Sequence, residues 1–220
     1  MISENLNNLK KQVGNQVAIV AVSKKKSPEM ILEAYKAGHR HFGENYVQEL
    51  CEKKEKLPQD ICWHFIGHLQ TNKVKQIAPF IYLIHGVDSF KLLKEINKQA
   101  QINNRKINVL LQAHIAQEET KFGLNKAELY AIIGSDELKK MENISILGLM
   151  GMASNTENSA IIEKEFKELN EIYSEIKKRR LLNLDFKILS MGMSSDYHIA
   201  LKEGSNMLRI GSTIFGERIN

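Results

Sequence analysis

Short, almost continuously apolar runs alternate along the chain with longer stretches in which apolar residues recur every three or four positions. The short runs predict β-strands, and their lack of strict alternation favours parallel strands that are covered on both faces. The predicted strands are VAIVAVS (17–23), RHFGEN (40–45), CWHFIG (62–67), IYLIHGV (81–87), INVLLQAHI (107–115), ISILGLMGM (144–152), FKILSMG (186–192) and LRIGSTIF (208–215). The longer stretches between them predict amphipathic helices.

The helical pattern is clearest between residues 157 and 180, where one face carries Ile162, Phe166, Leu169, Tyr173 and Ile176. Further helices are predicted near 2–13, from Ser27-Pro28 to Gly38, within SFKLLKEINKQAQ (89–101), and after Asn45, Leu69, Leu124 and Ser194. Strands that alternate with helices in this way predict an α/β protein, a (β/α)8 TIM barrel preceded by an extra N-terminal helix. A doubly wound open sheet is the structural alternative, and the number of strands favours the barrel.

Length and composition favour a single domain over residues 1–220, because 43% of the residues are hydrophobic and single α/β barrels reach this size. The polar N-terminus has no signal-peptide core, and the longest apolar runs are too short to span a membrane. Cys51 and Cys62 lack metal-finger spacing, which favours free thiols in a reducing compartment. We therefore expect a cytoplasmic protein without a membrane span.

The net charge of +5 raises the question of a nucleic-acid partner. The 31 basic residues are interleaved with 26 acidic ones, and the aromatic-basic pattern of single-strand binders is missing. A small anionic ligand suits a mildly basic protein equally well, so we expect no nucleic-acid partner. His64 and His68 are four residues apart, but they lie at a predicted strand rather than on a helix, so we expect no metal site.

Lys24 follows the first predicted strand, at the end of the barrel where active sites gather. If Ala18, Val20 and Val22 point into the barrel, the two-residue period of a strand also sends Lys24 inward. A partly desolvated lysine there is a candidate Schiff-base nucleophile, since desolvation favours the neutral amine. The alternative is a loop lysine whose ammonium group reaches water. Lys25 is expected to lean outward.

The last two predicted strands carry SMGMSSD (190–196) and RIGS (209–212), and many barrels bind a phosphate at this position. Hydroxyl donors and glycines that permit close backbone approach are supplied by Ser190, Ser194, Ser212, Gly192 and Gly211. The alternative is ordinary turn and capping chemistry. Arg209 favours the phosphate site, because a guanidinium inside a strand needs a partner.

Seven stretches together resemble the pyridoxal-phosphate homeostasis proteins, the YggS/PROSC family. These stretches are AVSKKK (21–26), FGENYVQE (42–49), WHFIGHLQTNK (63–73), ETKFG (119–123), GLMGMA (148–153), LSMGMSSD (189–196) and MLRIGSTIFGER (207–218). They occur in the expected order and cover nearly the whole chain. One departure is His68, where the family commonly has proline, and it concerns the shape of that loop.

The resemblance implies a barrel like the N-terminal domain of alanine racemase, with pyridoxal 5'-phosphate (PLP) held as a Schiff base on Lys24. Lys26 and Lys121 match further lysines near the family's site. Asn45 would line the ring, and Arg209 would face the pyridine nitrogen and leave it unprotonated. The phosphate would be held by Ser190, Gly192, Ser194, Gly211 and Ser212.

Alanine racemases add a second, β-rich domain with the other catalytic base, whereas this sequence ends at Asn220, just after the last predicted strand. We therefore expect no such domain and, as the resemblance implies, a non-enzymatic PLP-binding protein of vitamin B6 homeostasis. It would be a monomer in transient contact with PLP-dependent apo-enzymes. Two alternatives stay open, a weakly active PLP-dependent amino-acid racemase and a class I aldolase-like barrel that uses Lys24 on a sugar phosphate.

Overall fold

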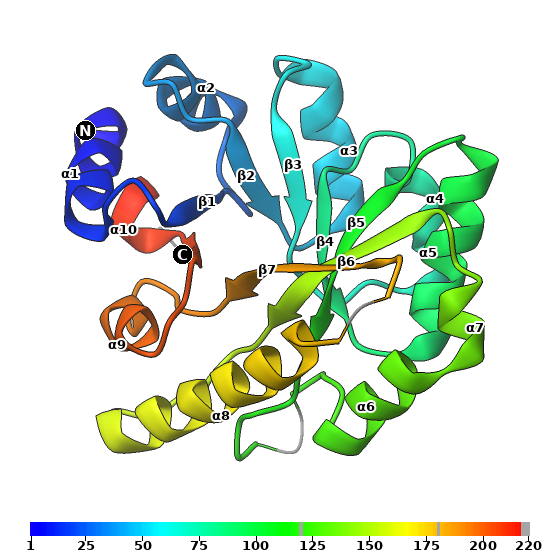
Figure 1. The fold of residues 1–220 in the computed structure, drawn as a ribbon. Helices are drawn as coiled ribbons and strands as arrows, with labels where there is room; N and C mark the ends of the chain where they lie inside the picture. The colour runs from blue at the N-terminus through cyan, green and yellow to red at the C-terminus, as the bar shows by residue number, and fades with distance from the viewer. Residues whose placement is uncertain (119–120, 180, 217–220) are drawn as a thin grey trace.

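Eight parallel strands form a closed barrel in a computed structural model that describes residues 1–118, 121–179 and 181–216 (Figure 1). The strands are β1 (Ala18–Val22), β2 (His41–Glu44), β3 (Cys62–Phe65), β4 (Leu83–Val87), β5 (Ile107–Gln112), β6 (Ile144–Met150), β7 (Leu184–Ser190) and β8 (Met207–Ile210). They pair in chain order, and β8 closes on β1 with Ala21 opposite Ile210. The predicted barrel is confirmed, and the open sheet is ruled out.

Helices surround the barrel at the predicted places (Figure 1). They are α1 (Ile2–Val13), α2 (Pro28–Lys36), α3 (Val47–Lys56), the 3-10 turn η1 (Thr71–Lys73), α4 (Val74–Ile77), α5 (Phe90–Ile102), α6 (Lys126–Gly134), α7 (Asp136–Lys139), α8 (Ser159–Lys177), α9 (Tyr197–Lys202) and α10 (Ser212–Phe215). The predicted extra N-terminal helix is α1, which packs beside α10 and α2. Arg180, Glu119, Thr120, Glu217 and Arg218, which belong to the predicted helix end and motifs, lie outside the described residues.

The last predicted strand, 208–215, is wrong in its second half. β8 ends at Ile210, and the chain turns at Gly211 into α10. Ile214 and Phe215 are buried there, and the Asn5 side chain of α1 donates a hydrogen bond to the carbonyl of Ile214 at 3.1 Å. The apolar run is continuous because these residues bury themselves against α1 rather than within the sheet.

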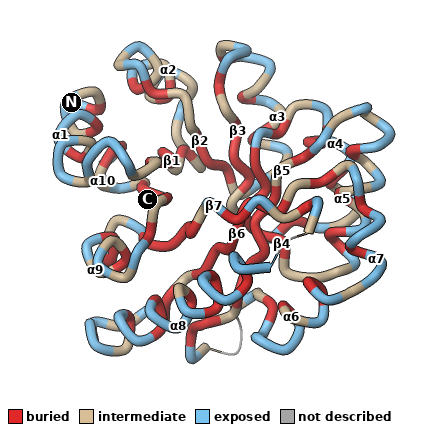
Figure 2. The backbone as a smooth tube through the Cα atoms, viewed as in Figure 1, coloured by how far each residue is buried: buried red, intermediate tan, exposed pale blue. Residues whose placement is uncertain are grey.

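The buried apolar residues form two layers, one inside the barrel and one between strands and helices (Figure 2). The inner layer contains Val20, Leu83, Leu110, Leu147, Met150 and Met207. Ile19 and Ala21 belong to the outer layer, so β1 alternates between the two faces as a strand should. This alternation confirms the inward direction of Val20 from which the position of Lys24 was predicted.

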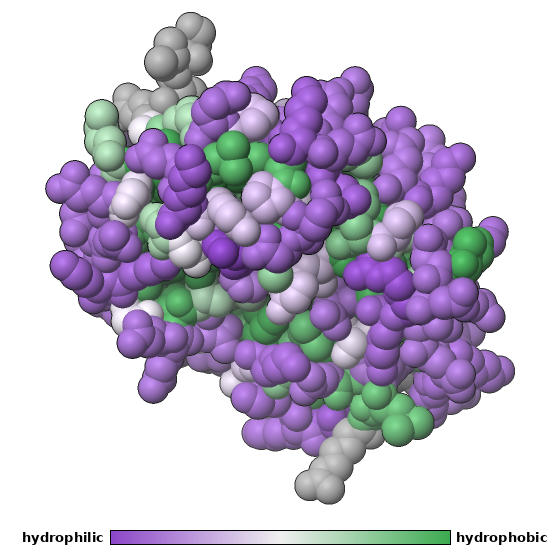
Figure 3. Space-filling view, turned by 90° about the horizontal axis from the view of Figure 1, so that it is seen from above, coloured by the Kyte–Doolittle hydropathy of each residue, from purple (hydrophilic) through white to green (hydrophobic). Residues whose placement is uncertain are grey.

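The surface seen in Figure 3 is mostly hydrophilic, and its hydrophobic residues form small, separate areas. Such areas are normal on folded domains and do not by themselves mark a docking site. Within the described ranges, no helix combines the length and apolarity needed to cross a membrane.

Candidate functional site

A cavity of about 690 Å³ opens at the carboxyl ends of the strands. Its lining includes most of the predicted site residues, namely Lys24, Lys26, Asn45, Ser194, Arg209, Gly211 and Ser212. Sequence reasoning missed Ser195 and Thr213, which also line it, although both directly follow a predicted site serine. Among the described lining residues, the charged ones are all basic, which suits a small anionic ligand.

Three predicted site residues lie outside this lining. Gly192 has φ 99°, and a Cβ there would stand 2.7 Å from the Cβ of Ala200, so backbone conformation and packing account for the glycine. The Lys121 ammonium donates to the carbonyl of Ala153 at 2.7 Å and pairs with Glu118 at 3.2 Å. Ser190 is fully buried beneath Arg209.

The three consecutive lysines differ in environment. Lys24 and Lys26 are half-buried and line the cavity, whereas Lys25 is exposed and does not line it. The Lys26 ammonium donates to the carbonyl of Gly216 at 3.2 Å. Lys25 has φ 59°, an uncommon conformation for a residue with a side chain, and it turns the chain between its two neighbours. The backbone therefore presents the first and third lysines to the cavity.

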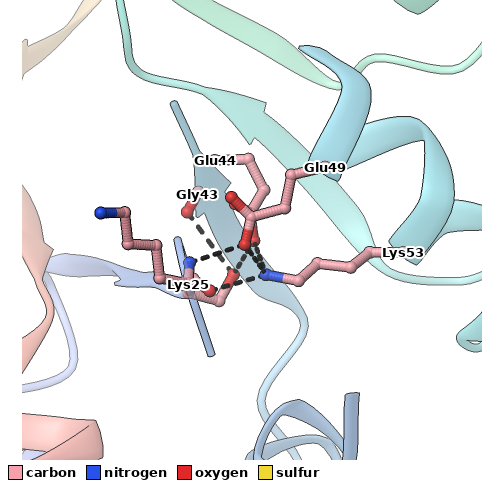
Figure 4. Close-up of polar contacts among 6 residues, drawn as sticks. Lys25, Gly43, Glu44, Glu49 and Lys53 are labelled. Atoms are coloured by element: carbon pink, nitrogen blue, oxygen red, sulfur yellow. Dashed lines mark hydrogen bonds and ion pairs between the residues drawn. The ribbon is translucent and has the colours of Figure 1, made fainter. Parts of the chain in front are cut away.

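A buried polar cluster made of Ser23, Glu44, Glu49 and Lys53 supports this turn (Figure 4). We call it the carboxylate–lysine cluster. The Lys53 ammonium lies 2.8 Å from Glu44 Oε1, 2.7 Å from Glu49 Oε1 and 2.7 Å from the carbonyl of Ser23. The Ser23 hydroxyl donates to Glu44 Oε1 at 2.6 Å, and the backbone N–H of Lys25 donates to Glu49 Oε1 at 2.6 Å. The side chain of Lys25 points away from the cluster (Figure 4).

Burial raises the pKa of the Glu44 carboxyl, while the Lys53 ammonium acts in the opposite direction. The cluster therefore fixes the backbone on both sides of Lys24 with charged hydrogen bonds. The sequence contained one signal of it, the acidic residue Glu44 near the end of the predicted strand 40–45.

Arg209 lies on β8, in register with Val20 of the inner layer, and is 4% exposed. Its Nη1 donates to the carbonyl and hydroxyl oxygens of Ser190 at 2.9 and 2.8 Å, and its Nη2 donates to the carbonyl of Gly151 at 2.9 Å. Burial lowers the pKa of the guanidinium to about 10, so it stays charged at neutral pH. The structure thus fixes a cation at the base of the cavity with neutral acceptors.

Polar groups on the cavity wall are placed to contact a ligand. The Asn45 Oδ1 atom is buried and has no hydrogen-bond partner within the described protein. The Ser194 hydroxyl accepts from the backbone N–H groups of Gly211 at 3.3 Å and Thr213 at 3.4 Å. A Cβ at Gly211 would meet the Cβ of Val22 only at 3.5 Å, an ordinary contact, so this glycine leaves space that the protein itself does not fill.

His68, the departure from the family pattern, has a defined place beside the cavity loops. Its Nδ1 lies 2.7 Å from Asp88 Oδ2, and its ring stacks on Phe122 with centroids 3.9 Å apart. These contacts tie the loop after β3 to the segment that carries Lys121. His68 is not among the residues that line the cavity.

These residues fit a phosphorylated aldehyde. The cavity lining combines two lysines, a guanidinium held by hydrogen bonds, several hydroxyl groups and a glycine that leaves space. The orphaned Oδ1 of Asn45 leaves a hydrogen-bonding position for a polar ring substituent. Amines can condense with an aldehyde, and the cations and hydroxyls can bind its anionic group.

Comparisons with known proteins agree with this geometry. Residues 1–219 match the family model described as alanine racemase, N-terminal domain. The chain is 39% identical over 205 residues to the pyridoxal phosphate homeostasis protein of Aquifex aeolicus, with 93% of this chain and 88% of that protein covered. It is 40% identical over 213 residues to the human pyridoxal phosphate homeostasis protein, with 92% and 77% covered.

Among solved structures, PipY of Synechococcus elongatus PCC7942 without PLP superposes with a TM-score of 0.92 at 34% identity, covering 98% of this chain and 100% of that one. The same protein with PLP bound gives a TM-score of 0.89. Alanine racemase of Clostridium difficile 630 gives a TM-score of 0.75 at 16% identity, with all of this chain and 57% of that one covered. The racemase likeness supports the fold alone.

Proposed function

Because this chain belongs to the pyridoxal phosphate homeostasis protein family, we propose that the cavity at the carboxyl ends of the strands binds PLP. We call it the mouth cavity. The observation that carries the proposal is the all-basic charge of the described cavity lining, with Lys24 and Arg209 in one cavity. The PLP-bound structure of PipY, 34% identical to this chain, supports the same assignment.

Each lining residue has a proposed task. The Lys24 amine attacks the aldehyde carbon, a C=N bond forms, and the carbonyl oxygen leaves as water. Arg209 would face the ring nitrogen as a fixed cation, and Asn45 would offer its unpartnered amide oxygen to a ring substituent. Ser194, Gly211 and Ser212 hold the phosphate. Lys26 supplies a second amine beside the first.

We propose that the protein holds and releases PLP without catalytic turnover. Support comes from the family to which it belongs and from the place of Arg209 in the cavity lining, since a cation that faced the ring nitrogen would weaken PLP as an electron sink. The alternative is a weak amino-acid racemase in which Lys26 acts as the second base, an idea favoured by its place in the same cavity as Lys24. Incubation with L- or D-alanine, followed by chiral chromatography, distinguishes the two: sustained inversion supports the racemase.

Lys24→Gln tests the attachment point, with Lys25→Gln as the matched control one residue away. We expect the purified wild type to be yellow after loading with PLP and to bleach on borohydride reduction, with mass spectrometry locating the adduct on Lys24. Lys24→Gln should lose most of the colour and the adduct, while Lys25→Gln, exposed and outside the cavity, should keep both. An unchanged yellow Lys24→Gln protein would show that another amine is used.

Three further expectations stay predictions: transient contact with PLP-dependent apo-enzymes, a monomeric state and a cytoplasmic location. Ser190, Gly192 and Lys121 lie outside the cavity lining, so we propose supporting roles for them in place of direct contact with PLP. Ser190 is proposed to hold Arg209, Gly192 to shape the backbone before Ser194, and Lys121 to secure its loop through Ala153 and Glu118.

A further inference from the structure

Three histidines on neighbouring strands form a continuous hydrogen-bonded row through the barrel. His41 Nδ1 lies 3.0 Å from His64 Nε2, and His64 Nδ1 lies 2.9 Å from His85 Nε2. His85 Nδ1 in turn lies 3.3 Å from the hydroxyl of Ser190, which accepts from Arg209 at 2.8 Å. We call His41, His64, His85 and Ser190 the histidine relay. At one end of the relay, His41 lines a second cavity of about 500 Å³ at the amino ends of the strands. At the other end, Ser190 contacts Arg209, which lines the mouth cavity.

The histidines of the relay are neutral. His64 and His85 are fully buried, and burial lowers the pKa of each well below its ordinary value. The charge of Arg209 lowers the pKa of His85 further. Burial also lowers the pKa of His41. A neutral imidazole has one N–H donor and one acceptor nitrogen, so each ring can accept from one neighbour and donate to the next.

Arg209 fixes the direction of this row, because a guanidinium can only donate. The Ser190 oxygen accepts from Arg209, and its own hydrogen then has one described acceptor, His85 Nδ1. A buried hydroxyl hydrogen without an acceptor would be costly. His85 must therefore carry its hydrogen on Nε2 and donate to His64 Nδ1. By the same logic, His64 donates from Nε2 to His41, and His41 keeps its Nε2 hydrogen at the half-buried end.

We propose that the histidine relay is a positioning device for Arg209, in which all three histidines are held as the Nε2–H tautomer. Three of the five guanidinium N–H groups are used on Ser190 and Gly151, and two remain for the cavity that Arg209 lines. The relay holds the cation at the cavity base through neutral acceptors. The buried Asp196 carboxyl attracts the guanidinium but does not bond to it among the described residues, so the two remaining N–H groups are available to a ligand. The statement that Arg209 serves a ligand in this cavity rests on the proposed binding of PLP.

The tautomers can be read in the PLP-free protein. Long-range ¹H–¹⁵N correlation spectra of the ¹⁵N-labelled protein at neutral pH should show protonated Nε2 and unprotonated Nδ1 for His41, His64 and His85. Single substitutions assign the signals. A protonated Nδ1 on His85 or His64, or averaged signals from both nitrogens, would overturn the relay. This measurement needs no ligand, so it stands whether or not PLP binds.

The link to the cavity is tested in the PLP-loaded protein by comparing His85→Leu with His85→Gln. Leucine breaks the relay, whereas glutamine can accept from Ser190 with its oxygen and donate to His64 with its nitrogen. We expect His85→Leu to shift the visible absorption band of bound PLP and to weaken binding about tenfold, the change expected for loss of one hydrogen bond in a charged network. His85→Gln should restore most of both properties.

His39→Asn is the matched control, since His39 is also buried, and its one hydrogen bond among the described residues goes to the backbone carbonyl of His41 rather than to a relay side chain. It should leave the absorption band unchanged even where it lowers stability. An unchanged band and affinity in folded His85→Leu would refute the positioning role. If His85→Leu does not fold, His41→Leu at the half-buried end replaces it, and unchanged ¹⁵N signals of His64 and His85 in that variant refute the relay. Wild type that binds no PLP would refute the proposed function and leave the tautomer result intact.

Discussion

Two buried polar networks support the basic groups of one cavity, and they do so in opposite ways. The carboxylate–lysine cluster beneath the lysine turn is charged, with Lys53 bonded to Glu44 and Glu49. The histidine relay beneath Arg209 is neutral, and the guanidinium bonds only to carbonyl and hydroxyl oxygens among the described residues. The first network fixes backbone, and the second fixes a charged side chain.

The difference matches what the proposed function asks of each basic group. As the proposed nucleophile, Lys24 needs a fixed backbone, and the cluster supplies it by bonding to the carbonyl of Ser23 and to the N–H of Lys25. As the proposed cation facing the ligand, Arg209 needs free N–H donors at the cavity. Its described hydrogen-bond acceptors are neutral oxygens of Ser190 and Gly151, and the buried Asp196 carboxyl attracts the guanidinium and raises its pKa without bonding to it among the described residues.

Lowering the pH should give the largest effect, because the buried histidines and the buried Glu44 carboxyl change the free energy of unfolding in opposite directions. Burial lowers the pKa of His39 to about 4 and of His64 and His85 well below the usual value, so these groups take up protons mainly in the unfolded chain. Burial of these neutral rings therefore does not reduce the free energy of unfolding above the unfolded pKa of about 6.5, but reduces it as pH falls below that value. His39 alone should lower the free energy of unfolding by about 3 kcal/mol at pH 4. Glu44 has a raised pKa and opposes this loss, since its folded form takes up a proton more readily.

Urea unfolding between pH 7.5 and pH 4 measures this dependence. The free energy of unfolding should fall steadily below pH 6.5, and His39→Asn should reduce the slope. Glu44→Gln should steepen it, because the opposing proton uptake disappears. A wild-type free energy that is flat across this range would contradict the neutral state of the buried histidines.

Breaking the charged network should be nearly as damaging at neutral pH. Lys53→Met leaves the fully buried Glu44 carboxylate without its cation, and loss of one partner from a buried pair costs about 3–5 kcal/mol. Urea unfolding at pH 7 checks this, with Lys56→Met as the control, since Lys56 is an exposed lysine of the same helix. Glu44 can become neutral by taking up a proton. The difference in the free energy of unfolding between Lys53→Met and wild type should therefore become smaller as pH falls. Equal losses at all pH values would argue against Glu44 as the stranded group.

The sequence predicted the direction of side chains along one strand better than the contacts between side chains of different strands. Two-residue alternation on β1 made Lys24, two residues beyond the strand, a candidate for the inward face, and the family resemblance decided for it; a guanidinium inside β8 singled out Arg209. The relay could not be seen, because its histidines are 23 and 21 residues apart and meet only when β2, β3 and β4 pair. Residues 212–215 were misassigned for a related reason: apolar residues bury equally well in a strand and against a helix.

Lys53 shows a second limit. With Glu49 it forms an i,i+4 pair, a pattern typical of exposed helix surfaces, and nothing local distinguishes it from the neighbouring lysines of α3. Its burial depends on Glu44 at the end of β2 and on the carbonyl of Ser23, which directly follows β1. The family resemblance supplied the cavity residues, and the three-dimensional fold supplied the groups that hold them.

The smallest effect should come from Glu49→Gln, which keeps the shape of the cluster and removes one charge at its half-buried edge. Glu49 is 22% exposed, so its pair with Lys53 is partly screened, and the amide oxygen can still accept from Lys25. We expect a loss below about 1 kcal/mol in urea unfolding. PLP loading, read from absorbance, should be retained because the turn at Lys25 persists. Glu49→Leu removes the acceptor as well, so a loss of PLP loading in Glu49→Leu but not in Glu49→Gln would show that the hydrogen bond to the Lys25 backbone, rather than the charge, places Lys24.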